Sequence, residues 1–119
     1  MEMKYFTIAE LTHSDTAERE NIANMPPKQA IANLQRLTTV TLDPAREQLG
    51  SPIRVNSGYR SPRLNRRVGG VADSLHMQGR AADLTTPSGQ NRRLFAILQR
   101  LPHTELIWEK GGRWIHVAL

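Results

Sequence analysis

The sequence predicts an α+β domain with a small, mainly antiparallel sheet and flanking helices. In the first half of the chain, apolar residues recur at helical spacing between Pro26 and Gly50. In the second half, short segments of alternating polar and apolar residues are bounded by glycine and proline, as is typical of strands. The pair Gly111-Gly112 separates the last two of these segments and predicts a hairpin turn.

A chain of 119 residues is long enough for one hydrophobic core, which predicts a single domain over 1–119. Its first part, 1–25, is expected to dock on a core formed by 26–119. Within the docking segment, 5–11 predicts a short amphipathic turn or helix. The polar stretch 12–24 is expected to be irregular.

The core elements are predicted from their caps and apolar faces. Pro26-Pro27 opens a helix, because proline is tolerated in the first turn, and Gly50 ends the helical segment. Pro44 either kinks one long helix or occupies the first turn of a second helix that Asp43 caps. Further helices are expected over 63–68, capped by Ser61, and after Pro87-Ser88, with strands over 53–57, 80–84, 106–109 and 114–119.

The composition excludes some functions and leaves others open. There are 16 lysines and arginines against 11 acidic residues, and the net charge of +5 suits a polyanionic partner: nucleic acid, an anionic membrane surface or a cell wall. Base stacking needs aromatic residues, and only Tyr59 interleaves with the central arginines, so no nucleic-acid partner is expected. The absence of cysteine excludes disulfides and thiolate metal sites. No apolar run has the length of a membrane span or of a signal-peptide core, so neither is expected.

The stretch 74–83 carries the residues that best predict chemistry. It holds His76 and Asp83, separated by Gly79, which allows a turn between them. A third candidate ligand, His116, lies near the C-terminus. Two histidines and one aspartate give three protein ligands and one open position, which is the ligand count of a catalytic zinc site. From the residue types alone, Asp83 could also be a surface carboxylate and His76 a hydrogen-bonding loop residue.

The motif Ser74-x-His76-x-x-Gly79-x-Ala81-x-Asp83 resembles the signature of peptidase family M15. That family holds the zinc D-Ala-D-Ala carboxypeptidases and dipeptidases and related phage endolysins. Two further segments, 57–61 and 114–117, resemble the family's arginine-bearing turn and third-ligand strand, and the three blocks stand in the family's order. The resemblance covers 26–119 and is closest to the short single-domain, endolysin-like members.

The resemblance implies a fold shared with the hedgehog signalling domain and a zinc ion held by His76, Asp83 and His116. It implies a metallopeptidase in which zinc-activated water hydrolyses a peptide bond in peptidoglycan stem peptides. D-Ala-D-Ala carboxypeptidase and endopeptidase cleavage both remain open. Such an enzyme is expected to act at the bacterial cell wall, whether phage-encoded or periplasmic, and to be a monomer.

Two further residues are expected to be catalytic. In the family, the arginine that matches Arg60 faces the scissile carbonyl, so Arg60 is expected to stabilise the developing oxyanion. The alternative is a solvated turn arginine. Many family members carry an acid three residues before the last ligand, but here that position is Arg113, which cannot accept a proton. Glu109, across the Gly-Gly turn from His116, is the expected general base, and the alternative is a surface ion pair with Arg113.

Substrate contacts are expected for Ser74, Tyr59 and Trp114. Ser74 either contacts the substrate or only caps its turn. Trp114 alternates with His116 and is therefore expected to face the same side of the sheet. His103, after a predicted helix end, is expected to cap backbone carbonyls.

The arginine at position 113 motivates a rival hypothesis, in which the chain is a non-catalytic, zinc-containing module that binds cell-wall peptides. Stem-peptide binding without cleavage would favour this hypothesis over the enzyme. A third hypothesis, a basic nucleic-acid-binding domain, rests on the net charge alone and predicts salt-sensitive DNA binding.

Overall fold

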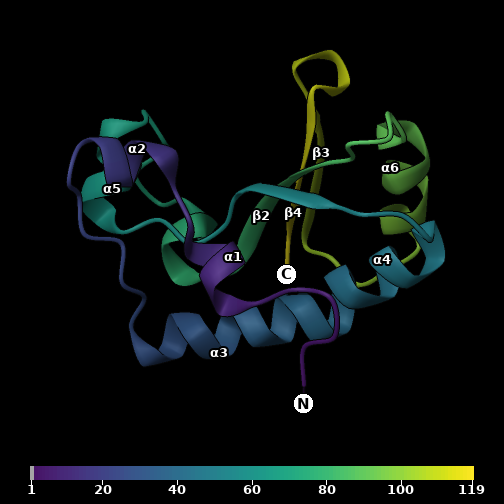
Figure 1. Cartoon of the computed structure of the whole chain (residues 1–119), viewed down its shortest axis with the longest axis horizontal. Helices are drawn as coiled ribbons and strands as arrows, with labels where there is room; N and C mark the ends of the chain where they lie inside the picture. The colour runs from purple at the N-terminus through teal and green to yellow at the C-terminus, as the bar shows by residue number, and fades with distance from the viewer. Residues whose placement is uncertain (1) are drawn as a thin grey trace.

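The computed structural model describes residues 2–119 and confirms the α+β class (Figure 1). Met1, the first residue of the predicted docking segment, lies outside the described residues. No helix in this range has the length and apolar character that a membrane span requires. In chain order the elements are α1 (Ile8–Thr12), α2 (Asp15–Arg19), α3 (Lys28–Leu37), the π turn η1 (Thr38–Leu42), α4 (Asp43–Leu49), β1 (Arg54–Ser57), α5 (Pro62–Arg67), the 3₁₀ turn η2 (Leu75–Gln78), β2 (Ala81–Thr85), α6 (Asn91–Gln99), β3 (Glu105–Glu109), the 3₁₀ turn η3 (Lys110–Gly112) and β4 (Trp114–Ala118).

The sheet has the strand order β1-β2-β4-β3, and each neighbouring pair is antiparallel. In Figure 1 the β3–β4 hairpin extends towards the top, between α5 on the left and α6 on the right. Asp83 of β2 lies opposite His116 of β4, and Ile107 of β3 lies opposite His116 on its other side. Residues directly opposite each other share one face of the sheet. The register therefore places two predicted ligands next to each other on the central strands.

The two faces of the sheet have different roles. Residues that alternate with the predicted ligands are fully buried and pack with leucines of α3 and α6 in the hydrophobic core: Ala82, Leu84, Ile115 and Val117. Because successive strand residues point to opposite faces, Asp83 and His116 point away from this core. The apolar alternation that drives the sheet onto the helices thereby leaves the ligands on the open face.

The helical segment before the sheet is one continuous run from Lys28 to Leu49, as one of the two alternatives predicted. The backbone stays in the right-handed helical region where α3 passes through η1 into α4. Pro44 has no N–H to donate, and the π turn just before it is closed by the Asp43 N–H donating to the Thr38 carbonyl. Gly50 ends the run in the left-handed region with φ 72°.

Asp43 does not cap α4, as the other alternative required. Its carboxylate accepts hydrogen bonds from the backbone N–H groups of Lys4 and Tyr5, at 2.7 and 3.0 Å. Leu11 of α1 is fully buried in the same core as α3. The N-terminal segment is thus held on the helical layer by the burial of apolar side chains and by two hydrogen bonds from its backbone to the Asp43 carboxylate.

The prediction that 12–24 is irregular was wrong, because this stretch contains α2. The Ser14 side chain caps the helix by accepting a hydrogen bond from the Ala17 N–H, at 3.1 Å. Ala17 and Ile22 pack against Leu64 of α5 in a small second cluster. A helix of five residues buries so few apolar side chains that it leaves no periodic pattern in the sequence.

Gly79 occupies a position that no other residue fits well. Its φ is 71°, in the left-handed region, and a Cβ built there would lie 2.3 Å from the carbonyl oxygen of Ala30 in α3. The glycine of the motif is therefore required both by the turn after His76 and by close packing on α3.

Gly79→Ala is expected to lower the free energy of unfolding by roughly 1–3 kcal/mol, from backbone strain alone, and by more from the contact with Ala30. Urea denaturation measures this loss. Gly89→Ala is the matched control, since Gly89 has the same φ of 71° but open space around its Cβ position. Equal losses in the two variants would show that the approach to Ala30 is unimportant.

Candidate metal centre

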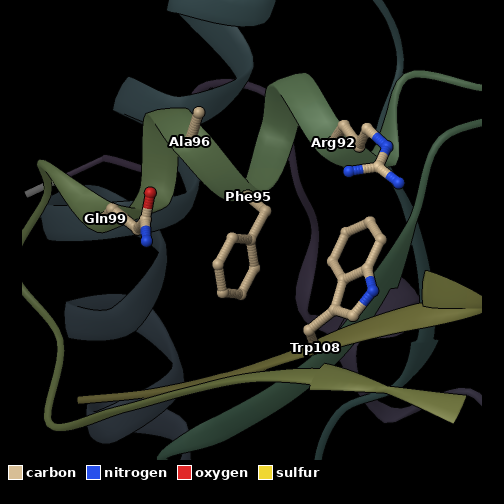
Figure 2. A pocket seen from close by; sticks show the side chains of 5 residues that line it. All are labelled: Arg92, Phe95, Ala96, Gln99 and Trp108. Carbon is tan, nitrogen blue, oxygen red and sulfur yellow. The ribbon is translucent and has the colours of Figure 1, made fainter. Parts of the chain in front are cut away.

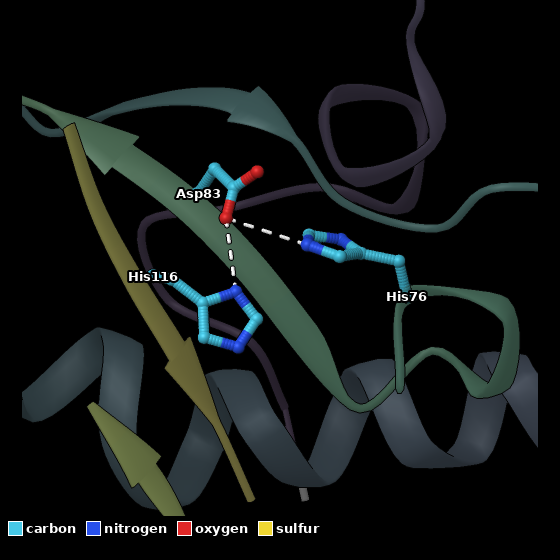
Figure 3. Close-up of side chains that lie close together, drawn as sticks. All are labelled: His76, Asp83 and His116. Atoms are coloured by element: carbon cyan, nitrogen blue, oxygen red, sulfur yellow. Dashed lines mark hydrogen bonds and ion pairs between the residues drawn. The ribbon is translucent and has the colours of Figure 1, made fainter. Parts of the chain in front are cut away.

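Three side chains from distant parts of the chain meet on the open face of the sheet (Figure 3). Asp83 comes from β2, His116 from β4 and His76 from η2. The Asp83 Oδ1 atom lies 3.1 Å from the His116 Nδ1 and 3.3 Å from the His76 Nε2. One nitrogen or oxygen atom from each residue lies within 4.8 Å of the other two. The structure therefore brings the predicted ligands together with their donor atoms converging.

His76 is held in one orientation by its backbone surroundings. The residue is 2% exposed, and its Nδ1 lies 2.7 Å from the carbonyl oxygen of Gly58. A carbonyl only accepts hydrogen bonds, so Nδ1 carries a proton, and Nε2 is the nitrogen that faces Asp83. Gly58 can come this close to the site because it has no side chain: a Cβ would lie 2.1 Å from the Leu11 carbonyl oxygen.

His116 uses its two ring nitrogens in the opposite order. Nδ1 faces Asp83, while Nε2 lies 2.8 Å from Oε1 of Glu105, at the start of β3. The two histidine rings approach edge to face, with their centroids 5.4 Å apart. Each histidine thus turns one nitrogen to the site and has an acceptor near the other.

The charges at this centre act on one another strongly. Burial alone would raise the pKa of Asp83, but hydrogen bonds from His116 and His76, and the positive charge of both rings, outweigh it and lower the pKa to about 2. The hydrogen bond to Asp83 raises the pKa of His116 above its ordinary value, against the opposing effect of burial. The carboxylate is therefore ionised at neutral pH, as a metal ligand must be.

The lowered pKa of Asp83 predicts acid sensitivity in the metal-free protein. A carboxyl whose pKa falls from 3.8 to about 2 on folding stabilises the fold above pH 3.8. This contribution, about 2 kcal/mol, is lost as the pH falls from 3.8 through 2. Urea denaturation of metal-free protein across this range should show a smaller acid loss in Asp83→Asn than in the unsubstituted chain. Parallel stability curves for the two proteins would contradict this prediction.

The donor set fits zinc. Two imidazole nitrogens and one carboxylate oxygen are ligands that zinc accepts without thiolate. Two ligands of a tetrahedral zinc ion, each about 2.1 Å from it, are roughly 3.4 Å apart. The separations of 3.1 and 3.3 Å between Asp83 and the two histidines are close to this value. Three protein ligands leave one position open to an exchangeable group.

The centre lies in a cleft of about 750 Å³. One wall is formed by the segment between α5 and η2, and the other by β3, η3 and β4. Three exposed apolar side chains line it: Val68, Val71 and Ile107. The cleft thus combines the candidate metal centre with charged and aliphatic surfaces that a peptide could contact.

Arg60 is a cleft residue, not a solvated turn arginine. Its backbone N–H donates to the His76 carbonyl at 3.1 Å, and its Nη2 donates to the Ser74 Oγ at 3.3 Å. Burial lowers the pKa of Arg60, and the negative charge of Asp83 opposes that effect. Its Nε is buried and has no hydrogen-bond partner among residues 2–119. The guanidinium is therefore held in the cleft close to Asp83.

Glu109 lines the same cleft and shares the face of β3 with Ile107. Since Ile107 lies opposite His116, Glu109 is a diagonal neighbour of that ligand, a relation that spans roughly 7–8 Å. Within residues 2–119, Glu109 forms no ion pair with Arg113. The alternative of a surface ion pair thus finds no support.

The three predicted substrate contacts have different positions. Trp114 lines the cleft, as its alternation with His116 predicted. The Ser74 Oγ caps η2 by accepting from the His76 N–H at 3.2 Å, and it also lines the cleft. The prediction for Tyr59 needs correction: it is 4% exposed, packs in the hydrophobic core and does not line the cleft. The reason is that the turn directs consecutive side chains to opposite sides, so Arg60 enters the cleft and Tyr59 the core.

Trp108 lies on the helix side of β3, away from the centre. Figure 2 shows it facing Phe95 of α6, with ring centroids 5.4 Å apart, and the guanidinium of Arg92 lies 5.8 Å from its ring. His103 is exposed, and its Nδ1 donates to the Leu101 carbonyl at 2.8 Å, as the predicted capping role requires.

Sequence reasoning missed two contributors to the centre, Glu105 and Gly58. Glu105 could be found only from the register of β3 against β4, because it stands eleven positions before His116. Gly58 lies two positions before Arg60, but the sequence does not show that its carbonyl accepts a hydrogen bond from His76.

Three converging ligands with one open position in a cleft are the arrangement typical of catalytic rather than structural zinc sites. A comparison with known families matches residues 4–118 to Peptidase M15, so this chain belongs to the peptidase M15 family. This confirms the resemblance seen in the motif. The chain is also similar to the zinc D-Ala-D-Ala carboxypeptidase of Streptomyces albus G, with 38% identity over 82 residues. The matched part is 66% of this chain and spans 30% of the relative's length.

Proposed function

We propose that this chain is a zinc-dependent metallopeptidase that hydrolyses a peptide bond in peptidoglycan stem peptides. The observation that carries the proposal is the convergence of His76, Asp83 and His116 on one open site in the cleft. Membership of a peptidase family and similarity to a zinc carboxypeptidase support it. When bound, zinc would polarise the scissile carbonyl and lower the pKa of a water molecule to about 7.

The remaining chemistry falls to two cleft residues. The guanidinium of Arg60 lines the cleft, donates to the Ser74 Oγ, and can stabilise the oxyanion that develops on the scissile carbonyl. Glu109 has a carboxylate in the cleft without an ion-pair partner in the described chain, and it can accept the proton of the attacking water. The same carboxylate then delivers the proton to the leaving amine.

The cleft suits a stem peptide in size and character. Val68 and Val71 on one wall and Ile107 on the other offer aliphatic contacts for alanyl methyl groups. The name of the similar Streptomyces protein favours carboxypeptidase action on D-Ala-D-Ala over endopeptidase action. Such a substrate places the working site of the protein at the bacterial cell wall, where we expect it to act as a monomer.

Mass spectrometry of purified muropeptides after incubation with the protein tests this proposal. Loss of one alanine from a pentapeptide stem identifies the carboxypeptidase, whereas two peptide fragments or separated cross-links identify an endopeptidase. Asp83→Ala should give no products, and His103→Ala, which changes an exposed histidine outside the cleft, should digest normally. Unchanged muropeptides in the presence of zinc would contradict the proposed activity.

Position 113 holds an arginine where many family members have an acid, so the rival hypothesis of a non-catalytic binding module also needs a test. A binding module would retain muropeptides without altering their masses, and Glu109→Gln would bind them as well as the unsubstituted chain. The free carboxylate of Glu109 in the cleft favours the enzyme, because it offers a proton acceptor that Arg113 cannot replace.

A further inference from the structure

We propose that Glu105 is a positioning residue of the metal centre, which fixes the His116 ring so that Nδ1 is the nitrogen available to zinc. This inference rests on the proposed zinc site. Glu105 lines the cleft, and the role proposed for it is exerted through His116. Its basis is the 2.8 Å contact between Glu105 Oε1 and His116 Nε2.

The sheet places Glu105 where this contact forms. Glu105 lies opposite Ala118, and Ile107 lies opposite His116, so Glu105 is a diagonal neighbour of His116 on the cleft face. The Thr104 N–H donates to the Ala118 carbonyl at 2.8 Å and fixes the start of β3 against β4. The position of the carboxylate thus follows from the strand register and not from a flexible loop.

The chemistry of imidazole explains why this contact matters. A neutral ring carries one proton, and the nitrogen that binds a metal must be the other one. For His76, the Nδ1–H donates to the Gly58 carbonyl, and Nε2 is the nitrogen left for a metal. For His116 the geometry is reversed, because Nδ1 faces Asp83 and Nε2 faces Glu105. Each histidine therefore has an acceptor for the N–H that faces away from the centre when the other nitrogen binds a metal.

Without Glu105, nothing among the described residues would hold the proton on Nε2 of His116. Glu105 provides the one hydrogen bond that this nitrogen makes within residues 2–119. In its absence, the proton could move to Nδ1. There it would hydrogen bond to Asp83 and occupy the lone pair that binds the metal. Loss of an acceptor of this kind costs about 10–100-fold in metal affinity. The Glu105 side chain is 46% exposed, which places the expected loss near the lower end, about tenfold.

The two carboxylates on the cleft face of β3 then have separate tasks. Glu105 and Glu109 stand two residues before and two residues after Ile107. Glu105 is bonded to His116, whereas Glu109 has no ion-pair partner in the described part of the chain. Substitution of Glu105 should weaken zinc binding, and substitution of Glu109 should leave zinc binding unchanged.

Zinc dissociation constants measured by competition with a chromogenic chelator test this inference. Glu105→Ala should raise the dissociation constant about tenfold. Glu105→Gln, whose amide oxygen can still accept a hydrogen bond from the Nε2–H, should retain most of the affinity. Glu10→Ala, at an exposed glutamate outside the cleft, is the matched control and should equal the unsubstituted protein. Zinc affinity in Glu105→Ala equal to that of the unsubstituted protein would overturn the proposal.

A second measurement keeps the inference separate from the proposed function. Nitrogen-15 NMR of the imidazole rings in metal-free protein at alkaline pH reports which nitrogen carries each proton. Both nitrogens of His116 face a carboxylate, so the fraction of the proton carried on Nε2 should be larger in the unsubstituted chain than in Glu105→Ala, where Asp83 is the remaining acceptor. If the unsubstituted protein bound no zinc, the proposed function would fail, and this measurement would still decide the role of Glu105. An unchanged proton position in Glu105→Ala would overturn that role.

Discussion

Replacement of His76 by alanine is expected to abolish both zinc binding and peptidase activity. The side chain is 3% exposed and supplies one of three converging donors, so its loss leaves two ligands and a cavity in the turn. Without the metal, the reaction loses several kcal/mol of transition-state stabilisation. The expected fall in kcat/KM is on the order of 10³-fold or more. Zinc content after dialysis and the rate of stem-peptide cleavage measure the two effects.

His103→Ala is the matched control for this substitution. His103 is exposed and bonds only to the nearby Leu101 carbonyl, so its removal should change neither zinc content nor rate. Circular dichroism should show that both variants keep the fold. A His76→Ala protein that retained stoichiometric zinc and full activity would place the metal, or the reaction, elsewhere in the chain.

Glu109→Gln is expected to lower kcat by about 10²–10⁴-fold while zinc content stays unchanged. Glutamine has nearly the same shape but cannot accept a proton from the attacking water. Steady-state kinetics across a pH series, together with zinc analysis, measure both effects.

Glu10→Gln controls for the loss of one negative charge, because Glu10 is exposed on α1. It should leave the kinetics unaltered. If Glu109→Gln cleaved the substrate at the full rate, Glu109 could not be the base. If the unsubstituted chain and Glu109→Gln bound stem peptides equally and neither cleaved them, the non-catalytic module would be the better account.

The positions of the three ligands could be predicted from the sequence because each lies in a segment with a strong local pattern. His116 sits in an alternating strand whose buried neighbours, Ile115 and Val117, fix the face of the sheet on which it points. Asp83 is placed in the same way by Ala82 and Leu84. The turn that carries His76 is set by a glycine with φ 71°.

The supporting contacts could not be predicted, because they depend on the register of strands and on backbone atoms. Glu105 reaches His116 only in the observed pairing of β3 with β4. The acceptor for His76 is a backbone carbonyl, which every residue possesses, so side-chain chemistry gave no signal at Gly58. The substrate contact predicted for Tyr59 was wrong, because side-chain directions in a non-repeating turn follow no periodic pattern in the sequence.

The helix α2 and the π turn illustrate the same limit in the fold. Both are short and depend on single contacts: the Ser14 cap begins α2, and the Asp43 N–H donates to the Thr38 carbonyl to close the π turn just before Pro44. Neither produces an apolar stripe of several turns, which is what sequence patterns detect best.

The most direct test of the proposed zinc peptidase is stem-peptide digestion by metal-stripped protein before and after zinc is restored. Mass spectrometry of the products gives the result. We expect no cleavage after chelation, and full recovery when stoichiometric zinc is added back. Cleavage that continues at the original rate in fully metal-free protein would contradict the assignment of His76, Asp83 and His116 as the ligands of a catalytic zinc ion.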